Sequence, residues 1–156
     1  MFGDLFTDKE KEKCLDILQD CGLPRTGNYW WVRYPKRAIT EIYSMDQNTG
    51  AMHYFRDRRL VWEEVIVNNY GTQFLLSIET NSNYPFDPPI VYVKDSEIDI
   101  SDASHQYGGG ALCLFRPDMY SSSWSIIKVR NIACSWCFCA ESENNTGKWP
   151  GAEAPH

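Results

Sequence analysis

Two stretches of the chain carry apolar residues at the spacing of an amphipathic helix. The first, Thr7–Cys21, opens with a capping-box pair and is followed by Gly22, which is typical of a helix end. The second runs from Trp124 to about Ala140. Its apolar face recurs at intervals of three and four residues and comprises Ile126, Val129, Ala133, Cys137 and Ala140. We expect the first helix to pack its apolar stripe on a sheet.

Between these two stretches the pattern is that of short β-strands separated by turns. Leu60–Val67 and Phe74–Thr80 are the clearest strands, and the turn-forming residues Asn68–Gly71 lie between them. Weaker patterns predict strands at Ala38–Ser44, Ala51–Phe55 and Ile90–Val93, with a turn at Asp46–Gly50. Short connections favour antiparallel pairing, because parallel neighbours need long crossovers. The predicted fold class is α+β: an N-terminal helix on an antiparallel meander of four or slightly more strands, a long loop, and a second long helix.

Composition indicates a single globular domain over residues 1–156, with 147–156 as an irregular tail. The chain is 43% apolar, and its net charge of −6 argues against a basic nucleic-acid-binding face. No apolar run approaches the ~18 residues of a membrane helix, and the N-terminus lacks a secretory-signal pattern. We therefore expect a cytoplasmic protein without a membrane or nucleic-acid partner, whose six cysteines are mostly reduced.

The segment from His105 to Trp124 is the candidate functional loop. Three glycines at 108–110 precede Cys113, and such loops carry function more often than packing. The Cys113 thiol suits acyl transfer through a thioester, although a buried loop cysteine is the alternative. His105 could be a general base or a loop anchor. No Gly-Lys-Ser/Thr follows the glycines, so they predict no phosphate cradle, and we expect no cofactor.

The helix after this loop carries two further groups of candidate residues. Cys134 and Cys137 are spaced as in thiol-redox sites but lie late in the helix, and no second ligand pair at zinc-finger spacing accompanies them. Core or half-buried thiols are the simpler interpretation, and no metal site is predicted. Glu141, Glu143 and Asn144 follow. They form either a solvated helix end or a polar gate that helps an attacking lysine lose its proton.

The motif YPFDPP at residues 84–89, followed by His105, by Cys113 eight residues later and by Trp124-Ser125, resembles the ubiquitin-conjugating enzyme family. The resemblance covers roughly residues 60–140. It implies a ubiquitin-conjugating (UBC) fold and a cysteine-dependent acyltransferase in which Cys113 is the nucleophile. It also implies catalytic roles for His105 and Tyr107 and makes Gly109, Gly110 and Trp124 candidates for binding a partner's extended tail.

The sequence departs from that family at the position after the histidine. Gln106-Tyr107 replaces the usual Pro-Asn pair, so the Tyr107 hydroxyl becomes the candidate substitute for the asparagine. With this departure the sequence resembles the bacterial branch of the family, which is found in CBASS antiphage operons. That resemblance implies a protein partner with a reactive C-terminus, a cGAS/DncV-like nucleotidyltransferase, with an activating enzyme acting in trans. The alternatives are a non-catalytic UBC-fold binding module and a thiol-redox protein using Cys134 and Cys137.

Overall fold

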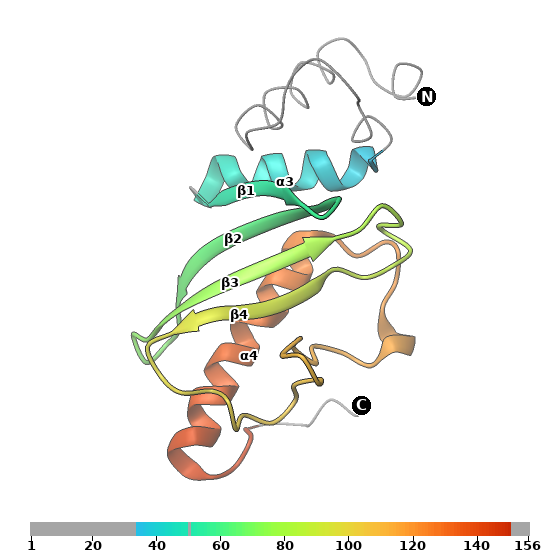
Figure 1. Cartoon of the computed structure of the whole chain (residues 1–156). Coiled ribbons are helices and arrows are strands. Elements are labelled where there is room, and N and C mark those ends of the chain that lie inside the picture. The colour runs from blue at the N-terminus through green and yellow to red at the C-terminus, as the bar shows by residue number, and fades with distance from the viewer. Residues whose placement is uncertain (1–33, 50, 151–156) are drawn as a thin grey trace.

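The computed structural model describes residues 34–49 and 51–150, and it has an α+β architecture (Figure 1). The predicted fold class is confirmed: a helix precedes a four-stranded antiparallel sheet, and a long helix follows it, consistent with a UBC-like fold. The helix predicted at Thr7–Cys21 lies outside the described residues. The elements in order are α3 (Lys36–Thr49), β1 (Met52–Arg56), β2 (Arg59–Val67), β3 (Gln73–Thr80), β4 (Ile90–Ser96), the 3-10 helix η2 (Pro117–Met119) and α4 (Ile126–Thr146).

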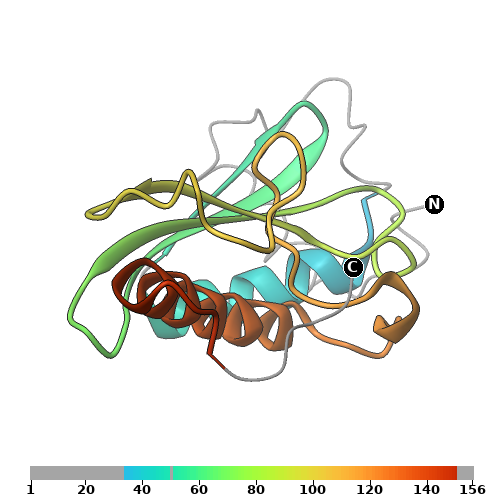
Figure 2. The same ribbon diagram turned by 90° about the horizontal axis from the view of Figure 1, so that it is seen from below.

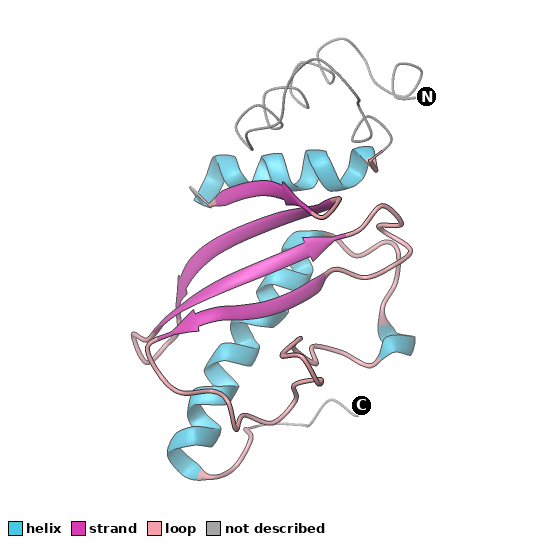
Figure 3. Cartoon of the chain, in the orientation of Figure 1, coloured by secondary structure: helices cyan, strands magenta, loops and turns pink. Residues whose placement is uncertain are grey.

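The sheet is a simple meander with the strand order β1-β2-β3-β4, coloured magenta in Figure 3. In its register Trp62 lies opposite His53 on β1 and opposite Ile78 on β3. Alternate residues of each strand point to one face, and that face is buried under α3 and α4, which lie on the same side of the sheet (Figure 2). The core between the sheet and the two helices includes Leu60, Trp62, Phe74, Leu76, Ile78 and Val91.

The predicted strand at Ala38–Ser44 is wrong, because these residues form the first part of α3. The buried residues Ala38, Ile39, Ile42 and Met45 recur at helical spacing, whereas a strand would bury every second residue. The threonine and isoleucines of this segment favour strands intrinsically, but tertiary packing overrides that preference. The predicted turn at Asp46–Gly50 is wrong for its first four residues, which continue the helix to Thr49.

The second long helix is confirmed, and it extends six residues beyond Ala140 to Thr146. Its N-cap is Ser125, whose side chain accepts a hydrogen bond from the backbone N–H of Lys128. It ends at Gly147, which has a left-handed φ of 77° and donates its N–H to the Glu143 carbonyl. All five residues of the predicted apolar face are buried. No helix in the described part of the chain is both long and apolar enough to cross a bilayer.

Glu41 on α3 ties three separate elements together. Its carboxylate accepts hydrogen bonds from the Tyr84 hydroxyl at 2.8 Å, the Ile126 backbone N–H at 2.9 Å and Arg37 Nε at 3.0 Å. Arg37 in turn donates to the backbone carbonyl of Trp124. Burial and the neighbouring Glu41 carboxylate raise the pKa of Tyr84 well above its usual value. These bonds fix the β3–β4 connection and the start of α4 relative to α3. The candidate loop ends at the start of α4, so its C-terminal end is fixed as well.

Candidate active site around Cys113

The loop between β4 and α4 folds back on itself just before Cys113. Gln106 pairs with Leu112 in an isolated β-bridge, and Gly110 donates its N–H to the Tyr107 carbonyl at 3.0 Å. Gly109 and Gly110 have φ of +92° and +89°, a conformation that side chains with a Cβ rarely adopt. An added Cβ would meet no atom within 4 Å at either position, so the turn requires glycine for its backbone conformation rather than for space.

Backbone hydrogen bonds hold Cys113 between the sheet and α4. The preceding residue, Leu112, donates its N–H to the Val91 carbonyl on β4 at 2.9 Å. Cys113 donates its own N–H to the His105 carbonyl at 2.8 Å. The same carbonyl accepts a hydrogen bond from Trp136 Nε1 on α4 at 3.1 Å. The thiol-bearing residue is therefore tied to β4 on one side and to α4 on the other.

Cys113 is largely shielded from solvent, and the Tyr107 hydroxyl influences the pKa of its thiol. Only 5% of Cys113 is exposed, whereas 46% of Tyr107 is exposed. Burial raises the pKa of the Cys113 thiol, and the hydrogen bond with the Tyr107 hydroxyl partly opposes this increase. The same hydrogen bond raises the pKa of Tyr107, as expected for a hydroxyl that donates to sulfur. The hydroxyl thus lies where it can stabilise a thiolate or a charge developing beside it.

Two hollows lie along the Cys113 loop, and Cys113 itself lines the first of them. The first has a volume of about 150 Å³ and is lined by His105, Cys113, Leu114, Ile132, Ser135, Trp136, Cys139 and Trp149. The second is an apolar groove of about 290 Å³, lined by Pro88, Pro89, Ile90, Tyr107, Ala111, Leu112, Leu114, Phe115 and Pro117. Leu114 borders both hollows. A group attached to the sulfur could therefore extend into the first hollow, which Cys113 itself lines.

His105 is placed as a loop anchor. Its backbone has a left-handed φ of 63°, which is uncommon for a residue other than glycine. Its carbonyl accepts the two hydrogen bonds from Cys113 and Trp136, and its ring packs on Trp149 with the centroids 4.5 Å apart. These contacts define a role in shaping the loop, and the predicted role as a general base stays a prediction.

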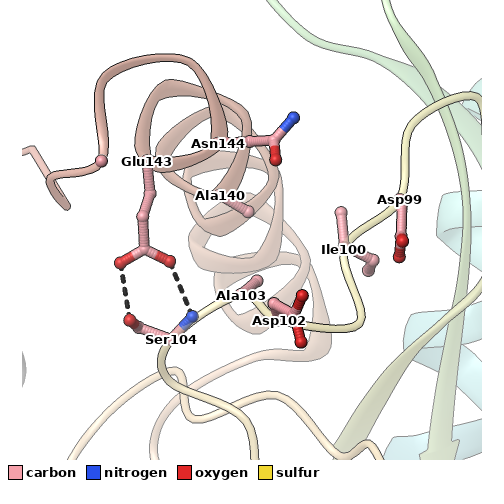
Figure 4. A pocket seen from close by; sticks show the side chains of 9 residues that line it. Asp99, Ile100, Asp102, Ala103, Ser104, Ala140, Glu143 and Asn144 are labelled. Carbon is pink, nitrogen blue, oxygen red and sulfur yellow. Dashed lines mark hydrogen bonds between the residues drawn. The ribbon is translucent and has the colours of Figure 1, made fainter.

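The three polar candidates at the end of α4 point to different places. Glu143 accepts hydrogen bonds from the Ser104 backbone N–H at 2.7 Å and its hydroxyl at 2.6 Å, as the dashed lines in Figure 4 show. It therefore supports the residue directly before His105. Glu141 is buried and accepts a hydrogen bond from Thr72 Oγ1 at 2.7 Å and another from Asn68 in the β2–β3 turn. Asn144 is exposed and, with Glu143, lines a pocket that also contains Asp99 and Asp102 (Figure 4).

Trp124 belongs to an aromatic cluster at the end of the loop. Its ring lies 5.2 Å from the ring of Phe115 and 5.7 Å from that of Tyr120, both with edge-to-face geometry. Lys128 Nζ lies 4.1 Å from the centre of the Trp124 ring. Tyr120 also donates its hydroxyl to the Pro85 carbonyl of the YPFDPP segment at 2.7 Å. This cluster holds the part of the loop after Cys113 in place, directly before α4 begins.

Several neighbours of Cys113 were not found by sequence reasoning. Trp136 and Cys139 lie one helical turn apart on α4, and both line the smaller hollow. Trp149 falls in the stretch predicted as an irregular tail, yet it packs on His105 and on Trp136. Its only sequence signal is a large aromatic residue shortly after a helix-ending glycine. Cys137 is fully buried in the core, where burial raises the pKa of its thiol, as expected for a packing residue.

Comparison with known proteins agrees with this geometry. A family model described as "Type II CBASS E2 protein" matches residues 41–156, which include the whole sheet, the Cys113 loop and α4. No curated protein sequence matches the chain. The match covers well over half of the chain and begins within α3, at Glu41. The chain therefore belongs to the type II CBASS E2 family and is an E2-like protein of the CBASS antiphage system.

Proposed function

We propose that Cys113 accepts an acyl group from the C-terminus of a partner protein as a thioester and then transfers it to an amine or holds it. The observation that carries this proposal is a cysteine that lines a hollow and is held in place by the bond from its backbone N–H to the His105 carbonyl. Membership of an E2 family supports conjugating chemistry in general. A sulfur nucleophile is suited to it because the thiolate both attacks and leaves readily.

The first step is an exchange between two acyl carriers. The Cys113 thiolate attacks the activated carbonyl of the partner's C-terminus, the bond to the previous carrier breaks, and that carrier departs with the electron pair. An activating enzyme acting in trans supplies the activated carbonyl. In a second step an amine attacks the thioester, loses a proton, and releases Cys113 as the thiol. In both steps hydrogen bonding from the Tyr107 hydroxyl would stabilise the charged sulfur, in line with its lowering effect on the pKa of Cys113.

The partner in this proposal is a cGAS/DncV-like nucleotidyltransferase. Membership of a CBASS family implies work with other CBASS proteins, and a C-terminal tail is the simplest source of an acyl group. The apolar groove beside Tyr107 is suited to an extended tail because prolines and leucines line it. Gly109 and Gly110, in the turn between Tyr107 and Ala111, have open space where a Cβ would be, which suits close approach of a partner's backbone.

A Cys113→Ser variant tests the proposal directly. Incubated with the partner and an activating enzyme, it should trap an oxyester that survives thiol treatment, whereas the native protein should give an adduct that thiols remove. Cys113→Ala should give neither adduct. Cys134→Ser is the matched control, because Cys134 is half-buried on α4 and does not line the Cys113 hollow. Full adduct formation by Cys113→Ala would refute the assignment.

A non-catalytic binding module of the same fold is the second candidate. The observation in its favour is the burial of Cys113, which raises the pKa of the thiol and lowers its reactivity at neutral pH. This candidate predicts that Cys113→Ala retains both partner binding and antiphage protection. The thiol-redox alternative requires oxidation of Cys134 and Cys137, and mass spectrometry after mild oxidation would detect that disulfide.

A further inference from the structure

Trp149 is one of the residues that line the hollow beside Cys113. It comes two residues after Gly147, which ends α4, and the chain there has left the helix. The ring centroid lies 4.5 Å from that of His105 and 5.9 Å from that of Trp136. All three rings line the same hollow as the Cys113 thiol, and Trp149 is half-buried by these contacts. A residue from the end of the chain thus becomes a wall of the candidate active site.

The contacts of Trp136 and Trp149 converge on His105, whose backbone conformation is unfavourable by itself. His105 has a left-handed φ of 63°, and such a conformation in a non-glycine residue persists only where the surroundings hold it. The His105 carbonyl accepts the N–H of Cys113 at 2.8 Å, so any change in the His105 backbone moves the nucleophile. Trp136 holds this carbonyl through Nε1, and Trp149 packs on the His105 ring. The two tryptophans therefore hold the carbonyl and the ring of the same residue.

We infer that Trp149 is a positioning residue for the Cys113 thiol. It keeps His105 in the conformation that orients Cys113, and it limits the access of water and small molecules to the sulfur. The inference rests on the proposed function only in taking Cys113 as the nucleophile. Its first readout, the reactivity of the thiol towards a small reagent, requires neither a partner nor an activating enzyme.

Loss of the indole should change two rates in opposite directions. In a Trp149→Ala variant the hollow opens, so a small alkylating reagent reaches the sulfur more easily. Water also enters, which weakens the burial that raises the pKa of Cys113, and the pH midpoint of alkylation falls. Transfer between proteins needs an oriented thiol rather than an accessible one, so acylation by the partner becomes slower. A merely structural role would not separate these two effects.

The experiment measures alkylation of the full-length chain by iodoacetamide at a series of neutral and alkaline pH values, read by mass spectrometry of the Cys113 peptide. Trp149→Ala should react roughly three- to tenfold faster, the range that corresponds to one aromatic pair. Trp149→Phe keeps a ring on His105 and should react at close to the native rate. Phe138→Ala is the matched control, because Phe138 is a half-buried aromatic residue on α4 that stacks on Tyr70 and does not line this hollow.

A native rate and pH midpoint in Trp149→Ala would overturn the inference, and so would an equal increase in Phe138→Ala. Trp149→Leu retains an apolar side chain and serves as a second variant if Trp149→Ala loses its circular dichroism signal. It should also react faster than the native protein and slower in acylation. If the native protein forms no adduct with any partner, the proposed function fails, whereas the alkylation result still decides the positioning role of Trp149.

Discussion

Replacing Tyr107 by phenylalanine should make the Cys113 thiol less acidic. Burial raises the pKa of the Cys113 thiol, and hydrogen bonding with the Tyr107 hydroxyl lowers it. Tyr107→Phe removes the donor and keeps the ring in the wall of the apolar groove. The pKa of Cys113 then rises further above its usual value. At a pH below that pKa the thiolate fraction falls, and so does the rate of any reaction of the thiolate.

The size of the effect follows from the exposure of the two groups. A hydrogen bond to a charged group contributes about 1.5–3 kcal/mol in a shielded site. Because 46% of Tyr107 is exposed, water competes for its hydroxyl, and we expect about 0.5–1 kcal/mol instead. At about 1.4 kcal/mol per pKa unit, the midpoint moves up by about 0.4–0.7. The alkylation rate at neutral pH therefore falls roughly two- to fivefold.

The assay is the pH profile of Cys113 alkylation by iodoacetamide, with the half-buried Cys139 followed in the same digest as an internal reference. Tyr70→Phe is a matched control, because Tyr70 is 49% exposed and its hydroxyl bonds Ser142 at 2.8 Å. That variant should leave the Cys113 midpoint unchanged. A Tyr107→Phe midpoint equal to the native one, or at lower pH, would show that the hydroxyl does not stabilise the thiolate.

Two further predictions concern the frame that holds the loop. Glu41→Ala removes the acceptor for the Tyr84 hydroxyl and the Ile126 N–H and should lower the free energy of unfolding by about 2–3 kcal/mol in urea titrations. A loss below about 1 kcal/mol would contradict the linking role of this carboxylate. Glu143→Ala frees the Ser104 backbone N–H and hydroxyl, so amide hydrogen exchange in the loop leading to Cys113 should become faster. Unchanged exchange there would mean that Glu143 does not hold the loop.

The sequence pattern alone was sufficient to predict the elements in which buried residues recur at one regular interval. Leu60–Val67 and Phe74–Thr80 were predicted as strands with a turn between them, and they are the two central strands of the sheet. The apolar face of α4 was also predicted correctly, because a helix on a sheet buries residues three and four apart. The loop with Cys113 was recognisable by its glycines, which the observed turn requires at Gly109 and Gly110.

The sequence pattern failed where the intrinsic preference for strand and the helical spacing of the buried residues disagree. The segment Ala38–Ser44 contains residues that favour strands, yet its buried positions follow the helical period. Propensity differences amount to only about 1 kcal/mol, which is small beside the burial of Ile39 and Ile42 in the core. The end of α4 was misplaced for a different reason. Two asparagines at 144 and 145 are weak helix formers, but Gly147 is the residue whose left-handed backbone ends the helix.

Contacts between segments that are far apart in the sequence can be seen only in the folded chain. The motif and spacing identified Cys113 and marked Tyr107 as the departure from the family pattern, but only the turn at 108–110 brings the Tyr107 segment back beside the strand-like segment that leads to Cys113. Trp149 lies 36 positions beyond Cys113 in the sequence and reaches the site because α4 carries the chain back past His105. Sequence reveals local periods and short motifs, because these depend on neighbouring residues. The environment of a thiol depends on side chains from other elements, so the tertiary structure sets its burial, its hydrogen bond and its access to solvent.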